Sequence, residues 1–388
     1  MTRKQLFALF TCSLIVWTVG GSLFTLLPGH ARRLGADDSL AGFYLASAFF
    51  ATTIGSISAG WLAKRFQRRR LMLLLAGGIT IPTLLLMSRA TTLPALIITT
   101  DLAWFLAGVE LTLLAILTGL FADKSTRGRT FGVIATTNGI ANVIGGLAAG
   151  RIADDWGMST LIALLAGVQI GFPLVAWLLE DRVVEQPSPG RVSSAGHGES
   201  LGLAFYLLLL ANITVWVSFH VNSLGRPLTM DTIGFDRASI SSVVAVRGAF
   251  SLPLPILIGW LSDRLGRKQL IALTYVGSMI SLLVLTGASE LWHFWLSALF
   301  ISAVRSGSVV GSALVTDLVA PEALDTAMSR FDATGWIGAI IGLSGTGVVI
   351  QSIGAQPTFL LGAFLPLLAL GLLYTVRPPR SALSLVRS

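Results

Sequence analysis

Long apolar runs alternate with short polar stretches along the whole chain. Twelve of these runs reach the roughly 20 residues that a helix needs to cross a bilayer. They cover residues 6–28, 38–63, 71–89, 93–121, 130–150, 157–180, 202–224, 238–262, 269–288, 291–319, 330–351 and 356–376. The pattern therefore predicts an all-α integral membrane protein with twelve membrane-spanning helices.

One polar stretch is much longer than the others. Residues 181–200 are rich in Ser, Gly and Pro, a composition typical of a flexible linker. The linker divides the expected helices into two sets of six. We expect an N-terminal six-helix bundle at residues 1–180 and a C-terminal one at residues 201–388.

Composition supports a membrane location and explains the basic charge. The chain is 54% hydrophobic and 12% charged, whereas soluble domains have about 25% charged residues. A net charge of +8 in a soluble protein would suggest nucleic acid. Here 19 of the 27 Lys and Arg fall in loops on one side of the expected helices, and 6 fall on the other. Cytoplasmic loops carry such an excess, so we expect no nucleic acid as a partner. Both termini and the linker should lie in the cytoplasm, and the protein in the plasma membrane (the inner membrane in a bacterium).

A short basic motif occurs twice, about half the chain apart. It reads GWLAKRFQRRR at 60–70 and GWLSDRLGRKQ at 259–269, an offset of 199 residues. Similar offsets align Gly139 with Gly338 and Gly146 with Gly345. Parallel repeats with a substrate site between them are a known transporter plan.

The two motifs and the six-plus-six pattern resemble the major facilitator superfamily, whose hairpin motif reads G-x-L-x-D-R-x-G-R-K. The second copy matches it at Gly259, Leu261, Asp263, Arg264, Gly266, Arg267 and Lys268. The first copy keeps Gly60, Leu62, Arg65, Arg68 and Arg69, but has Lys64 in place of Asp and Gln67 in place of Gly. The resemblance implies that the Asp helps to latch the cytoplasmic side. We therefore expect closure of that side to depend on Asp263.

A second resemblance is partial. Proton-coupled drug antiporters of this superfamily tend to have Gly-Pro-x-x-Gly-Gly in their fifth helix. The chain has the pair Gly145–Gly146 without the Gly-Pro.

Three ionisable residues lie near the middle of expected spans: Glu110, Arg247 and Arg305. Such residues are costly in a bilayer and tend to face the protein interior. The resemblance places Glu110 and Arg305 on helices that line a central cavity. We interpret Glu110 as a proton carrier and the arginines as ligands for an anionic group. The alternative is a permanent structural pair between Glu110 and one of the arginines.

Three further residues complete the candidate substrate or proton site. Asp101 lies nearer the outer edge and half a helical turn away from Glu110. Trp17 lies near the middle of its span rather than at an interface, where most membrane tryptophans are found. Asn212 suits substrate binding or a bond between helices.

These residues favour a secondary transporter that moves a small organic molecule by alternating access. We expect proton-coupled efflux. Uptake or uniport of an organic anion bound by Arg305 and Arg247 is the alternative, and a membrane sensor or channel is a third. The chain shows no catalytic motif and no Cys or His cluster, so we expect neither an enzyme nor a bound cofactor or metal. The expected partners are a small-molecule substrate, protons and the lipid bilayer, and we expect a monomer.

Overall fold

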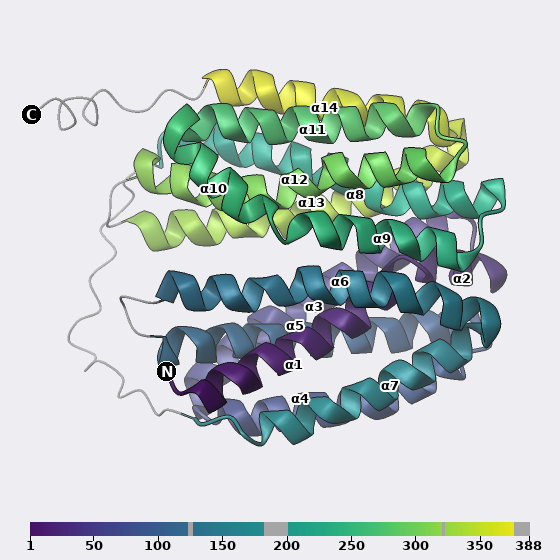
Figure 1. Cartoon of the computed structure of the whole chain (residues 1–388), viewed down its shortest axis with the longest axis vertical. Helices are drawn as coiled ribbons and strands as arrows, with labels where there is room; N and C mark the ends of the chain where they lie inside the picture. The colour runs from purple at the N-terminus through teal and green to yellow at the C-terminus, as the bar shows by residue number, and fades with distance from the viewer. Residues whose placement is uncertain (123–126, 182–200, 320–322, 376–388) are drawn as a thin grey trace, which may run out of the picture. The chain divides into compact units, whose positions relative to one another are not determined.

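A computed structural model describes residues 1–122, 127–181, 201–319 and 323–375. Within those ranges it contains fourteen α-helices and no strand (Figure 1). The helices are α1 (Arg3–Phe24), α2 (Leu27–Arg33), α3 (Asp38–Phe66), α4 (Arg69–Ser88), α5 (Leu93–Phe121), α6 (Arg127–Asp155), α7 (Gly157–Ala176), α8 (Leu203–Ile233), α9 (Arg237–Ser251), α10 (Leu254–Leu265), α11 (Arg267–Thr286), α12 (Leu291–Leu318), α13 (Leu324–Ile353) and α14 (Ala355–Thr375). The expected linker, beyond Asp181, lies outside the described residues.

The all-helical membrane fold expected from the sequence is confirmed. Eleven described helices are long and apolar enough to span a bilayer. The eighth expected span, at 238–262, is not one continuous helix. The chain breaks at Leu252 and Pro253 into α9 and α10, because proline has no N–H to donate and its ring clashes with the preceding turn.

Two other boundaries differ from the hydropathy pattern. The first expected span ends early, and the short helix α2 follows it with Pro28 in its first turn. The seventh continues to Ile233, nine residues past its expected end. The extension contains Arg226, which is 1% exposed. Packing around this part of α8 therefore overrides the local polarity on which the expected boundary was based.

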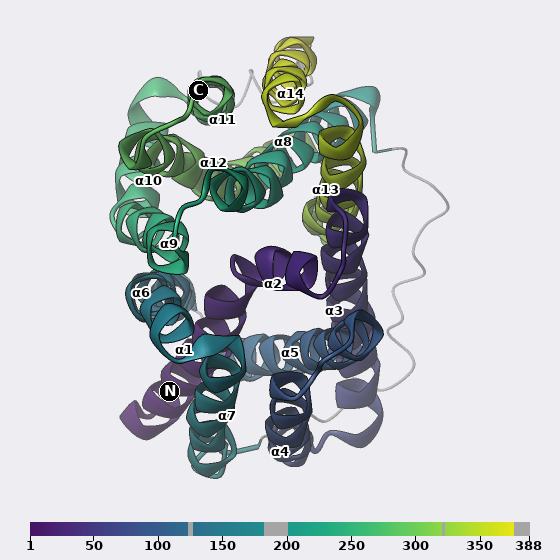
Figure 2. The same ribbon diagram turned by 90° about the vertical axis from the view of Figure 1, so that its right-hand side faces the viewer.

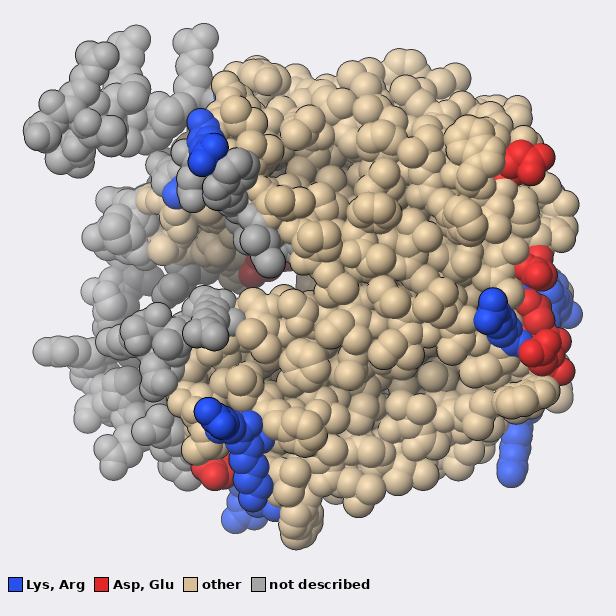
Figure 3. Space-filling view, in the orientation of Figure 1, with Lys and Arg blue, Asp and Glu red and all other residues tan. Residues whose placement is uncertain are grey.

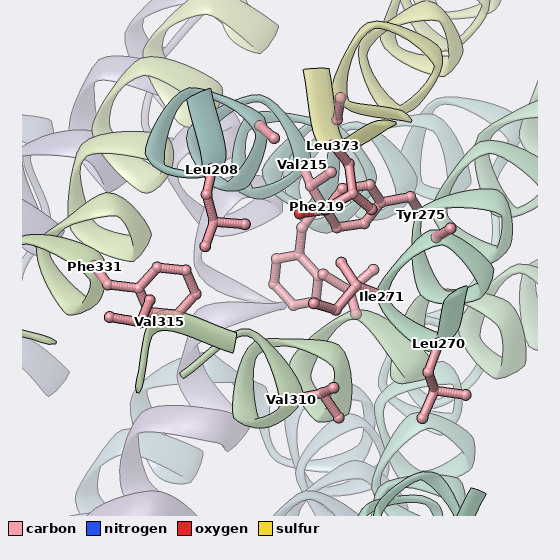
Figure 4. Close-up of a cluster of buried hydrophobic side chains, with 14 of the residues drawn as sticks. Leu208, Val215, Phe219, Leu270, Ile271, Tyr275, Val310, Val315, Phe331 and Leu373 are labelled. Carbon is pink, nitrogen blue, oxygen red and sulfur yellow. The ribbon is translucent and has the colours of Figure 1, made fainter. Parts of the chain in front are cut away.

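The described chain forms two compact units. The first contains α1–α7 together with Ser223–Leu252 and Leu343–Ser352. The second contains the earlier part of α8, Pro253–Gly342 and the residues from Ile353 onward. Its apolar core joins α8, α11, α12, α13 and α14, and Figure 4 shows Phe219, Ile271 and Tyr275 meeting there.

Small residues allow close helix contacts in the first unit. A Cβ at Gly55 of α3 would lie 2.1 Å from the Phe105 carbonyl oxygen of α5, and one at Gly108 would lie 2.3 Å from the Thr52 oxygen. Glycine is therefore required where these two helices cross, as is common between membrane helices.

The outer surface suits a bilayer. Large apolar side chains are exposed along many helices, among them Ile57, Ile98, Leu174 and Leu203. On the face shown in Figure 3, the charged side chains lie toward the helix ends, and a broad uncharged band lies between them. Exposure of so much apolar surface to water is unfavourable, whereas contact with lipid tails is not.

Candidate functional site

Glu110 lies inside the first unit, where α5 meets α4 and α7. Its side chain is 1% exposed. Thr80 of α4 and Gln169 of α7 lie within hydrogen-bond distance of the same carboxyl oxygen, Oε1, at 3.0 Å and 3.1 Å. Figure 2 shows these three helices side by side. The hydrogen bonds that the described residues form with Glu110 thus come from neutral polar side chains.

The Thr80 hydroxyl has two acceptors within reach and a single proton. It lies 2.9 Å from the Ala76 carbonyl oxygen and 3.0 Å from Glu110 Oε1. When the hydroxyl donates to Glu110, it stabilises an ionised carboxylate. When it donates to Ala76, its lone pair can accept a bond from a protonated carboxyl. Glu110 can therefore form hydrogen bonds with these partners in either protonation state.

Asp101 lies on the same helix and points elsewhere. It accepts a hydrogen bond from the Ser47 hydroxyl of α3 at 2.9 Å. The prediction that Asp101 and Glu110 face different sides of the helix is therefore confirmed.

The other predicted site residues are dispersed over several helices. Trp17 in α1 and Arg247 in α9 are partly buried, and Arg305 in α12 is exposed. Arg305 belongs to the second unit and Glu110 to the first. Their roles toward substrate remain predictions.

Asn212 forms a hydrogen bond between two helices, and the N-terminal half contains a corresponding bond. Its amide donates to the Thr334 hydroxyl of α13 at 2.6 Å. In the first half, the hydroxyls of Ser13 in α1 and Thr137 in α6 lie 2.9 Å apart. Each threonine also donates to the carbonyl three residues earlier, so each accepts from its partner. The offsets, 199 and 197 residues, match the sequence repeat.

The two hairpin motifs both have a residue with positive φ at the same position, but the backbone conformations of these residues differ. Gly266 has φ 89°. Gln67, 199 residues earlier, has φ 51° and is the one non-glycine residue with positive φ among the described residues. Gln67 has ψ 21° and lies in the left-handed helical region, whereas Gly266 has ψ 144°. The first copy therefore turns with a different backbone geometry, and residues other than glycine rarely adopt the left-handed conformation of Gln67.

The basic residues of the hairpins are held differently. In the second copy, the Arg267 guanidinium donates to the Ala313 carbonyl, and Lys268 Nζ donates to the Tyr374 carbonyl at 3.2 Å. In the first copy, Arg69 pairs with Asp181 at 3.6 Å. Gly60 has open space around its Cβ position, and Arg65 and Arg264 are exposed. Gly259 lies within α10, but the side chain of Asp263 lies outside the described part, so its latch role stays a prediction.

Sequence reasoning missed a group of contacts beside α2. We call them the α2-end network, defined by Arg32, Asp38, Asp154, Asp231, Arg237 and Gln351. Arg32 pairs with Asp38 and lies 3.4 Å from Asp231 and 3.0 Å from the Leu228 carbonyl. The network joins α2, α3 and α6 to α8, α9 and α13, far apart in sequence.

Helix capping forms the rest of the network. Asp154, at the end of α6, accepts from the Arg237 and Ala238 N–H groups at 3.2 Å and 2.8 Å. Gln351, near the end of α13, accepts from the Ser39 N–H at 3.0 Å. The first turn of a helix has N–H groups without intrahelical partners, and here another helix satisfies them. A lone polar residue at a helix end gives no sequence signal of such a distant partner.

Glycines bring the same helices close together. A Cβ at Gly146 of α6 would lie 2.3 Å from the Ala245 nitrogen of α9, and one at Gly42 of α3 would lie 2.6 Å from the Leu343 oxygen of α13. Figure 1 and Figure 2 both show α6 beside α9. Glycine thus permits close packing of α6 against α9 and of α3 against α13.

Solved structures share this fold. The nucleoside transporter NupG superposes with a TM-score of 0.78 at 16% identity, over 96% of this chain and 100% of that one. A bacterial homologue of the human lysosomal transporter Spinster, in an inward-facing and occupied conformation, gives 0.78 at 12% identity, over 97% of each chain. A peptide transporter of the POT family gives 0.77 at 14% identity, again over 97% of each.

Two curated proteins show sequence similarity. Multidrug resistance protein MdtG of Klebsiella pneumoniae (strain 342) is 25% identical over 285 residues, 68% of this chain and 67% of that protein. Human solute carrier family 67 member A1 is 26% identical over 196 residues, 49% of this chain. The alignment with the human protein spans less than half of its length, 45%.

A family comparison covers nearly the whole sequence. The sequence model of the Major Facilitator Superfamily matches residues 9–222 and again residues 200–386. Together with the membrane helices and the transporter folds of the structural relatives, this match shows that the chain belongs to the Major Facilitator Superfamily and is a membrane transporter.

Proposed function

We propose that this transporter exports a small organic molecule in exchange for protons. The observation that carries the proposal is the Glu110 site. It offers a buried carboxyl with Thr80 and Gln169 as hydrogen-bond partners in either protonation state. A proton carrier must exist in both states during each cycle, and this geometry supports both.

The position of Glu110 suggests how protons act on the rest of the protein. Its hydrogen bonds reach α4 and α7 from α5, so a change of protonation alters the contacts among three helices of the first unit. We propose that the proton acts by changing how these helices pack, and that substrate binds elsewhere. The candidates for substrate binding remain Trp17, Arg247, Arg305 and Asn212.

The export direction is supported by one relative. MdtG is named as a multidrug resistance protein, and this name fits the export of apolar compounds. The excess of Lys and Arg on one side supports cytoplasmic termini in a plasma membrane. On this orientation, the α2-end network lies on the outer side. We also propose that a single chain is the functional unit.

One observation favours the alternative, transport of an organic anion. Arg305 has an exposed side chain in the 28-residue apolar helix α12. A guanidinium facing lipid tails would be costly, so it is better placed facing a water-filled path. An anionic substrate would find a planar donor fork there.

Proteoliposomes that contain a pH-sensitive dye test the proposal. Purified protein should acidify or alkalinise the lumen when a transported compound moves, and Glu110→Gln should abolish the proton movement. The control is Asp155→Asn, which changes an exposed acid outside the candidate substrate or proton site and should leave the proton movement unchanged. Proton-coupled transport by Glu110→Gln at the wild-type rate would refute the role of Glu110. Transport without any proton movement in the wild type would refute proton coupling itself.

A further inference from the structure

The two hairpins differ in how many of their cations the protein itself uses. In the second, carbonyl groups accept hydrogen bonds from Arg267 and Lys268. In the first, the Arg65 and Arg68 side chains are exposed. Neither takes part in a hydrogen bond, ion pair or ring contact among the described residues. The first hairpin therefore presents two guanidinium groups for an outside partner.

The local charge is strongly positive. Residues 64–70 contain five Lys and Arg and no acid. Asp181 lies beside the hairpin, but it pairs with Arg69 at 3.6 Å and accepts from the Arg70 N–H at 3.1 Å. The second copy has Asp263 where the first has Lys64. An anion is thus attracted to the first hairpin more strongly than to the second.

Two exposed tryptophans indicate the depth of these cations in the membrane. Trp61 is 63% exposed and lies one helical turn before Arg65, so the two share a face of α3. Trp177 is 65% exposed, and the Arg70 guanidinium lies 4.8 Å from its ring centroid. Exposed tryptophans at helix ends lie at the level of the lipid headgroups. In Figure 3, basic side chains gather at the lower left of the molecule. In the same orientation, Figure 1 shows the adjoining ends of α4 and α7 there.

We propose that the hairpin of residues 61–70 binds the phosphate of an anionic phospholipid. Arg65 and Arg68 donate forked hydrogen bonds to the phosphate oxygens, while the Trp61 ring lies along the upper part of the acyl chains. The tryptophans favour a lipid over a free phosphate, because a soluble anion would gain nothing from them. The second hairpin has no equivalent pair of unoccupied cations among its described residues. This proposal is independent of the substrate and of proton coupling.

Native mass spectrometry of the full-length protein tests the proposal by titration with phosphatidylglycerol and, separately, phosphatidylcholine. The wild type should retain phosphatidylglycerol more tightly. In the variant Arg65→Gln/Arg68→Gln the affinity for phosphatidylglycerol should fall about 25-fold, since each surface cation contributes roughly fivefold. The matched control is Arg264→Gln, at the exposed arginine of the second hairpin, and it should keep the wild-type affinity. Unchanged affinity in the double variant would refute the proposal.

Two further measurements distinguish the source of the phosphate and do not depend on the variants. Soluble glycerol phosphate should fail to displace the lipid from the wild type at equal concentration, and equal competition would show a free-phosphate site instead. A photoactivatable phosphatidylglycerol should crosslink to peptides that contain residues 61–70 in preference to those with 259–269. Equal labelling of both hairpins would contradict the assignment.

Discussion

The Asp154 carboxylate at the end of α6 accepts a hydrogen bond, 2.8 Å long, from the backbone N–H of Ala238 in the first turn of α9. Gln351 makes the corresponding bond to Ser39 at the start of α3. Each of these helices has its own capping residue: Asp37 bonds to the Leu40 N–H, and Asp236 bonds to that of Ser239. Asp154 and Gln351 thus accept hydrogen bonds from N–H groups in the first turns of α9 and α3 that the local caps do not reach.

Removal of the first distant cap should weaken the contact between the end of α6 and the start of α9. Asp154→Ala leaves the Arg237 and Ala238 N–H groups without their acceptor, and loss of a capping side chain costs about 1 kcal/mol. The equilibrium between the bonded and the separated ends of α6 and α9 should shift toward separation by about fivefold. Spin labels at positions 155 and 233, in a Cys12→Ser background, would report the shift as a broader distance distribution.

The control for this experiment is Asp155→Asn, with the first label moved to position 156. For Asp155 the described residues show no bond to α9, so its change should leave the distribution as in the wild type. An Asp154→Ala distribution identical to the wild type would mean that the cap does not hold α6 and α9 together.

Two glycine substitutions on α6 should have opposite effects on stability. Alanine at Gly146 would place a Cβ 2.3 Å from the Ala245 nitrogen, whereas Gly132 has open space around its Cβ position. Gly132→Ala should raise the free energy of unfolding by up to about 1 kcal/mol, because alanine favours helix. Gly146→Ala should lower the free energy of unfolding. Thermal unfolding in one detergent measures both, and equal shifts would disprove close packing at Gly146.

The repeated bond between helices should contribute similarly in both halves. Thr334→Val removes the acceptor of Asn212, and Ser13→Ala removes the donor to Thr137. Each should cost roughly 0.6–2 kcal/mol of stability, the range for such bonds between membrane helices. A double-mutant cycle with Asn212→Leu and Thr334→Val isolates the pair from its surroundings. A coupling energy of zero would mean that the contact in the second half is incidental.

The two hairpin turns should respond differently to exchange of glycine. Gly266→Ala puts a side chain at φ 89° and should destabilise the protein by about 1 kcal/mol or more. Gln67→Gly removes the backbone strain of a glutamine with positive φ. The loss of stability should therefore be smaller than for Gly266→Ala, or stability should rise. Melting temperatures of the two variants test this, and a larger loss for Gln67→Gly would contradict the backbone argument.

His30 should make the α2 end sensitive to acid. Burial, and then the nearby positive charge of Arg33, lower the pKa of this imidazole. A histidine whose pKa is lower in the folded state stabilises the fold above its unfolded pKa of about 6.5, and that stability is lost as pH falls through this range. The melting temperature of the wild type should therefore decrease as the pH is lowered from about 7.5 to about 5. The melting temperature of His30→Gln should decrease less steeply over the same range. Equal slopes would exclude His30.

Hydropathy was enough to find the membrane helices because lipid requires about 20 apolar residues at each crossing. It failed at Pro253, where backbone chemistry breaks an apolar run, and at Arg226, where tertiary burial extends one. The basic motif was sufficient to suggest the family, because both copies keep a Gly, a Leu and two arginines at the same spacing.

The sequence revealed less about the candidate site. It singled out Glu110 as an acid in an apolar helix, but the face of α5 that carries it depends on the packing of α4 and α7. Asp154 and Gln351 could not be identified, since their partners are 84 and 312 residues away. Distances of that kind are decided by tertiary structure and leave no local pattern.

The α2-end network consists of bonds that water can replace. The side chains of Asp154, Asp231 and Arg32 retain 30%, 24% and 20% of their exposure, so each group that separates meets solvent rather than hydrocarbon. Breaking such a bond costs far less than leaving a polar group unsatisfied in lipid. Under the alternating access proposed above, each of these contacts can therefore be broken and remade in every cycle at a low cost in free energy.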